Sequence, residues 1–101
     1  MPSPNQPFIL IVDDNATNLS VLSQALKAAG YKVRIAVDGE DALAQVERHR
    51  PELILLDIEM PKMDGFETCR RLQANPETEG IPVIFMTALT ETENKVKGLS
   101  L

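Results

Sequence analysis

Residues 8–15 read FILIVDDN and residues 53–57 read LILLD, and these two stretches decide the fold. Each contains a short, uninterrupted apolar run, which is typical of a strand covered on both faces of a parallel sheet. The runs end in aspartates, the first in Asp13 and Asp14 and the second in Asp57. The two stretches therefore predict buried strands that carry carboxylates at the same end.

Two further strands and a series of helices are expected around these runs. Residues 32–37 (KVRIAV) alternate polar and apolar side chains, as an edge strand can, and residues 82–86 (PVIFM) form another apolar run. Apolar residues at helical spacing predict helices in the intervening segments, at Leu19, Leu22, Leu26 and Ala29, at Ala42, Leu43 and Val46, and at Phe66, Cys69 and Leu72. Thr90 and Glu93 have the spacing of a capping box, which predicts a last helix.

Alternating strands and helices predict an α/β fold, a doubly wound parallel sheet with right-handed crossovers. Strand composition favours the order 2-1-3-4, with residues 8–12 and 53–57 in the centre. This order leaves residues 82–86 at an edge although their composition is typical of a central strand, so the pattern lacks a fifth strand and its helix. Unpaired apolar edges recruit other strands. If the chain is truly truncated, we expect a homodimer or a domain-swapped assembly.

The carboxylates are expected to converge, because the carboxyl ends of parallel strands lie at one edge of a sheet. Neighbouring strands are about 4.8 Å apart, and the strand order reverses here, where open α/β sheets bind ligands. Clustered carboxylates repel one another unless a proton or a cation neutralises them, and oxygen ligands suit Mg²⁺. Asp13, Asp14 and Asp57 therefore predict a metal site.

A simpler interpretation makes each of these aspartates a turn former or a helix cap. Asp13 or Asp14 is a candidate cap for the helix that follows, and Asp38 for the next helix. Three such residues at facing strand ends, with Thr87 at a fourth, favour the site.

Composition limits the possible functions. The 101 residues suit one domain, with residues 1–7 as a flexible lead and residues 8–101 as the folded part. A net charge of −5 without a basic patch argues against direct nucleic-acid binding, and no apolar run has the length of a membrane span. The single cysteine, Cys69, suits a reducing cytoplasm.

Three motifs make the sequence resemble the receiver domain of bacterial two-component response regulators. They are residues 11–15 (IVDDN), 55–65 (LLDIEMPKMDG) and 83–88 (VIFMTA), in that order along the chain. The resemblance runs from about Phe8 to the end of the chain and implies a flavodoxin-like fold.

The resemblance implies a role for each matching residue. Asp57 would be the phosphoacceptor, Asp14 a direct ligand of Mg²⁺ or Mn²⁺, and Asp13 the holder of a metal-bound water. The backbone carbonyl of Glu59 would complete the protein ligands, and Thr87 would be the switch hydroxyl. The phosphoryl group would come from a phosphohistidine on a histidine kinase or a histidine phosphotransfer protein. The domain would then be no enzyme beyond its own phosphorylation and dephosphorylation.

One departure from the family pattern leaves two other functions open. Receivers carry a lysine at the end of a fifth strand, and Lys95 and Lys97, in the predicted last helix, do not replace it. The absence of that lysine favours a non-phosphorylated interaction scaffold. A Mg²⁺-dependent phosphatase is the other alternative, but such enzymes typically have a second aspartate where this sequence has Glu59.

Overall fold

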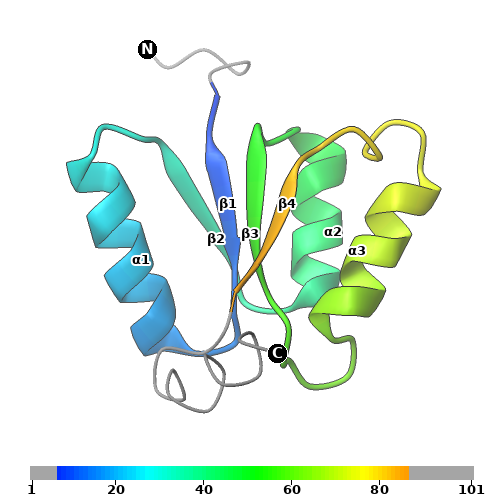
Figure 1. Cartoon of the computed structure of the whole chain (residues 1–101), viewed down its shortest axis with the longest axis horizontal. Helices are drawn as coiled ribbons and strands as arrows, with labels where there is room; N and C mark the ends of the chain where they lie inside the picture. Colours follow the sequence, from blue (N-terminus) through cyan, green and yellow to red (C-terminus); the bar gives the residue numbers. More distant parts are fainter. Residues whose placement is uncertain (1–6, 87–101) are drawn as a thin grey trace, which may run out of the picture.

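The structure, a computed structural model, describes residues 7–86 and contains a four-stranded parallel sheet (Figure 1). The strands are β1 (Ile9–Val12), β2 (Val33–Ala36), β3 (Leu53–Asp57) and β4 (Val83–Met86). They lie in the order β2-β1-β3-β4, which confirms the predicted order. The helix expected from Thr90 lies outside the described residues.

Three helices form the outer layers, α1 (Ala16–Ala28), α2 (Gly39–Arg48) and α3 (Gly65–Ala74). Figure 1 shows α1 on one face of the sheet and α2 and α3 on the other. Within residues 7–86, no helix has both the length and the apolar character that a membrane crossing requires.

Each helix begins after a side chain that accepts a hydrogen bond from a backbone N–H three residues later. The capping residues are Asn15, Asp38 and Asp64. The prediction for Asp38 is confirmed, whereas the cap expected from Asp13 or Asp14 is wrong. Asn15 directly precedes the first turn of α1, so its side chain takes the capping position instead.

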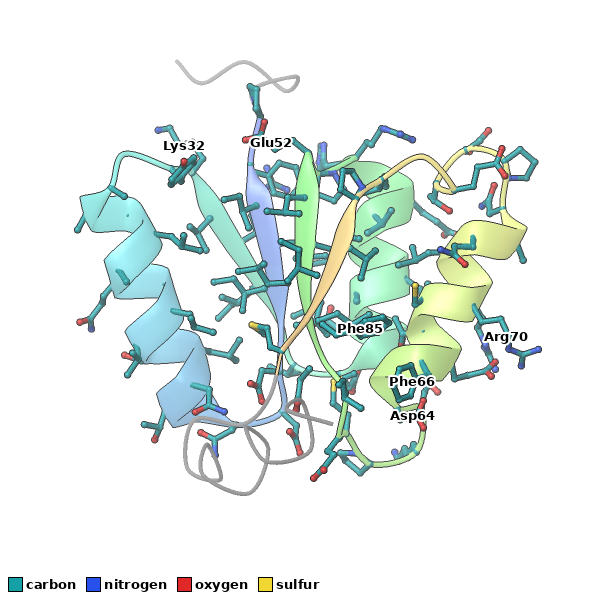
Figure 2. All side chains as sticks on the ribbon, viewed as in Figure 1. Lys32, Glu52, Asp64, Phe66, Arg70 and Phe85 are labelled. Carbon is teal, nitrogen blue, oxygen red and sulfur yellow. The ribbon has the colours of Figure 1, made fainter. Side chains whose placement is uncertain are left out.

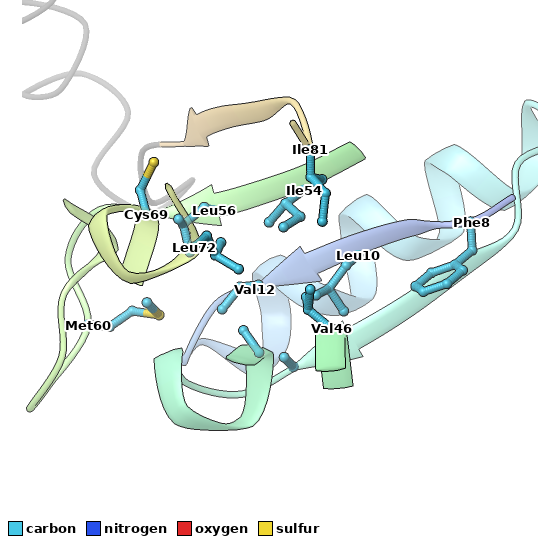
Figure 3. Close-up of a cluster of buried hydrophobic side chains, with 12 residues drawn as sticks. Phe8, Leu10, Val12, Val46, Ile54, Leu56, Met60, Cys69, Leu72 and Ile81 are labelled. Atoms are coloured by element: carbon cyan, nitrogen blue, oxygen red, sulfur yellow. The ribbon is translucent and has the colours of Figure 1, made fainter. Parts of the chain in front are cut away.

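The sheet separates two groups of buried side chains, and β1 is buried at all of its positions. The larger group lies between the sheet and the pair α2 and α3 (Figure 3) and contains Phe8, Leu10, Val12, Ala36, Ala42, Val46, Ile54, Leu56, Met60, Cys69, Leu72 and Ile81. The smaller group, on the α1 face, contains Ile9, Ile11 and Leu19. Alternate residues of a strand point to opposite faces, so β1 contributes to both groups, as its apolar run predicts.

Helix α3 differs from the sequence prediction at one position. Cys69 and Leu72 are buried as predicted, but Phe66 is 57% exposed. Phe66 lies in the first turn of α3, beside the end of β4. Its ring packs on Phe85 of that strand (Figure 2) instead of entering the core. The ring centroids are 5.0 Å apart and the ring planes are inclined by 50°.

Strand β4 forms an edge of the sheet that the described residues make, because it pairs only with β3. Its side chains Ile84 and Phe85 are exposed although both are large and apolar. The predicted apolar edge is therefore present. The homodimer or domain-swapped assembly expected from it stays a prediction.

Candidate functional site

The structure brings Asp13, Asp14 and Asp57 together at the carboxyl ends of the two central strands. Val12 of β1 pairs with Leu56 of β3, so the residues that follow, Asp13 and Asp57, lie at the same level of the sheet. Each of the three carboxylates offers an oxygen within 4.8 Å of those of the others. Parallel pairing of two neighbouring strands thus creates the cluster that the sequence predicts.

Both carboxylate oxygens of Asp13 accept hydrogen bonds from the start of α1. Its Oδ1 accepts a hydrogen bond from the backbone N–H of Asn15 at 2.8 Å, and its Oδ2 accepts one from Nδ2 of Asn18 at 3.1 Å. Asp13 and Asn18 are each only 1% exposed. Asn18 was not among the residues predicted from the sequence. The available signal was an amide on the inward side of an otherwise apolar helix face, one turn after the aspartates.

Asp57 is buried, and its environment disfavours the charged form. Burial is the main reason that its pKa rises from 3.8 to about 7, and the negative charge of Asp13 is the next. The charge of Asp14 adds a smaller effect in the same direction. The backbone N–H of Glu59, which donates to Oδ1 of Asp57 at 3.3 Å, opposes the shift. Near neutral pH the metal-free Asp57 therefore carries a proton for a large part of the time.

The donor set fits a hard divalent cation. Asp13 and Asp57 are buried while Asp14 is exposed, so the cluster borders solvent on the Asp14 side. Across residues 7–86, the ion pairs join Glu67 to Arg70 and Arg71, and none reaches the cluster. Carboxylate oxygens with no paired basic side chain suit Mg²⁺ or Mn²⁺, which carry the missing positive charge.

The loop that follows β3 holds the backbone at Asp57 through Gly65. The N–H of Gly65 donates to the carbonyl oxygen of Ile58 at 2.9 Å. A Cβ atom at Gly65 would lie 2.3 Å from the carbonyl oxygen of Asp57, so no larger residue fits without backbone movement. Met60 and Met63, which belong to the same loop, are buried. The loop therefore fixes the chain directly after the candidate acceptor.

The other residues singled out from the sequence lie elsewhere. Thr87, the expected switch hydroxyl, lies outside the described residues, as do Lys95 and Lys97. His49 is the C-terminal cap of α2, and Cys69 is buried in the core. The carbonyl ligand expected from Glu59 stays a prediction.

Comparison with known families settles what kind of domain this is. A family model for the response regulator receiver domain matches residues 9–101. The chain belongs to the response regulator receiver family. It is therefore a module of two-component signalling.

Two relatives from different organisms match along nearly the whole receiver chain. The response regulator PleD of Caulobacter vibrioides is 46% identical over 91 residues, which are 90% of this chain and 20% of PleD. The DNA-binding dual master transcriptional regulator RpaA of Synechocystis is 42% identical over 92 residues, which are 91% of this chain and 38% of RpaA. The receiver thus spans a fifth to about two fifths of these two relatives.

Solved structures share the fold of this receiver. The chemotaxis protein CheY4 of Vibrio cholerae matches with a TM-score of 0.77 at 33% identity, covering 94% of this chain and 79% of CheY4. The signal receiver domain of a histidine kinase from Syntrophus aciditrophicus matches with a TM-score of 0.77 at 36% identity, covering 93% of this chain and 71% of the kinase receiver chain.

Proposed function

We propose that this receiver accepts a phosphoryl group on Asp57 from a phosphohistidine of a histidine kinase or a histidine phosphotransfer protein. One observation carries the proposal: the buried carboxylate of Asp57 has oxygens of Asp13 and Asp14 within 4.8 Å. In the step, a carboxylate oxygen of Asp57 forms a bond to phosphorus while the bond from phosphorus to the imidazole nitrogen breaks. The imidazole leaves with that electron pair and takes up a proton.

The residues around Asp57 would act by position and charge. Asp13, Asp14 and Asp57, together with the backbone carbonyl of Glu59, would hold Mg²⁺ or Mn²⁺. The cation would neutralise charge on the carboxylates and on the transferring phosphoryl oxygens. The Glu59 N–H holds one oxygen of Asp57, and the loop closed by Gly65 keeps the strand end in place. Thr87 would supply a hydroxyl to the phosphoryl group.

A phosphodonor assay tests whether Asp57 accepts a phosphoryl group. The purified chain is incubated with a small-molecule phosphodonor and MgCl₂, and the covalent product is measured by intact mass. Wild type should gain one phosphoryl group, whereas Asp57→Asn should gain none. Glu47→Gln, which changes an exposed residue of α2, should react like wild type. Equal labelling of wild type and Asp57→Asn would place the modification elsewhere, and no labelling of either would favour the interaction scaffold.

The family consists of signal transducers, and the finer features of this member are part of the proposal. It would catalyse at most its own phosphorylation and dephosphorylation, and it would act in the cytoplasm. The free, buried Cys69 is compatible with a reducing compartment. Repeated turnover of an added phosphomonoester in the same assay would instead indicate a phosphatase.

A further inference from the structure

Asn18 combines deep burial with incomplete hydrogen bonding. It is 1% exposed in the first turn of α1, and its backbone N–H donates to Oδ1 of Asn15 at 3.0 Å. Its side-chain Nδ2 donates to Oδ2 of Asp13. Its Oδ1 is also buried and has no partner, alone among the side-chain nitrogen and oxygen atoms of the described residues. Buried polar atoms are normally paired, so this exception needs an explanation.

The orientation of the amide follows from its neighbour. An ionised carboxylate only accepts hydrogen bonds, so the amide must turn its NH₂ group toward Asp13. The unpaired oxygen is then a consequence of that contact. A leucine would fill a similar volume without a buried, unpaired oxygen, so packing alone does not explain an asparagine here.

The two contacts to Asp13 come from one helix end. Asn15 caps α1 with its side chain and donates its own N–H to Oδ1 of Asp13, while Asn18 reaches Oδ2. The first turn of α1 therefore holds both oxygens of a carboxylate that lies against Asp57. Side chains that orient metal ligands in this way generally raise metal affinity.

We infer that Asn18 is a positioning residue of the carboxylate site, which holds Asp13 in place through Nδ2. This inference rests on the proposed function, because it assumes that the cluster binds Mg²⁺. Asn18 would thus raise cation affinity by keeping the Asp13 carboxylate oriented.

Binding of MgCl₂ to the 101-residue chain, measured by calorimetry, tests the inference together with denaturant unfolding in EDTA. Asn18→Leu and Asn18→Ala should each weaken Mg²⁺ binding about tenfold or more. Asn18→Leu removes a buried oxygen without a partner but also leaves Oδ2 of Asp13 without its donor, so its stability in EDTA should fall modestly below that of wild type. Leu22→Ala is the matched control, since Leu22 lies on the same helix and packs on the smaller core group. It should lower stability while its Mg²⁺ affinity stays within about twofold of wild type.

The outcomes separate this inference from the proposed function. If wild type binds Mg²⁺ and both Asn18 variants bind it equally well, Asn18 is not a positioning residue and the proposed function stands. If wild type binds no Mg²⁺, the cation site and the role of Asn18 are both wrong. Equal weakening by Leu22→Ala and Asn18→Leu would also overturn the inference, because it would reduce the effect to general loosening of α1.

Discussion

Replacing Asp57 by asparagine should stabilise the metal-free domain, and the gain should depend on pH. The pKa of Asp57 rises from 3.8 to about 7 on folding, mainly through burial and then through the charge of Asp13. Between these two pH values the folded protein keeps a proton that the unfolded chain has released. The contribution of the Asp57 carboxyl group to the free energy of unfolding is therefore fully present below about pH 4 and is lost as pH rises toward 7. Asparagine has no such proton to lose.

The size of the effect follows from the shift. One pKa unit corresponds to about 1.4 kcal/mol, so a shift of this size corresponds to at most about 4 kcal/mol above pH 7. The cluster borders solvent through the exposed Asp14, and solvent screening weakens charge interactions. We therefore expect Asp57→Asn to be more stable than wild type by about 2 kcal/mol at pH 8, with the difference disappearing near pH 4.

Denaturant unfolding of both proteins in EDTA, from pH 4 to pH 8, measures this difference in the free energy of unfolding. Taking the difference cancels the contributions of most other titrating groups, and Glu47→Gln controls for removal of an exposed charge. Added Mg²⁺ should stabilise wild type more than the variant and reduce the gap. A variant that is less stable than wild type at pH 8, or a gap that does not change with pH, would refute the argument that burial and repulsion raise the pKa of Asp57.

Four further predictions concern the loop, a helix cap, the ligand set and the edge strand. Gly65→Ala should lower the free energy of unfolding by about 3 kcal/mol, because its methyl group would meet the backbone of Asp57. The control Gly80→Ala meets only the end of an arginine side chain and should cost far less, so equal costs would contradict the close approach at Gly65. Asp38→Ala should cost about 1 kcal/mol by removing the cap of α2, and an unchanged denaturant midpoint would argue against that cap. Asp14→Ala should weaken Mg²⁺ binding, measured by calorimetry, by more than about tenfold, because about tenfold is already lost when a residue that only orients a ligand is removed. Unchanged Mg²⁺ affinity would show that Asp14 is not a ligand. Light scattering should show self-association of the chain, and Ile84→Lys should reduce that association, because a lysine on an edge strand opposes strand pairing. A wild-type chain that is monomeric at high concentration would contradict the expected homodimer.

The sequence alone determined the architecture and the place of the carboxylate cluster. Uninterrupted apolar runs mark strands buried on both faces, and aspartates directly after two of them must meet once those strands pair in parallel. The convergence of Asp13, Asp14 and Asp57 follows from this rule and needs no knowledge of side-chain packing. Local spacing also identified Asp38 as a cap, because capping depends on residues only three positions apart.

The tertiary structure decided the features that depend on atoms from distant segments. The pKa of Asp57 reflects burial under neighbouring elements and the charge of Asp13, which is 44 residues earlier in the chain. Phe66 fits a helical apolar pattern, yet it lies outside the core because the first turn of α3 sits beside Phe85 at the end of β4. Asn18 lies only five residues after Asp13, but the sequence does not show the turn between β1 and α1 that brings its amide to that carboxylate.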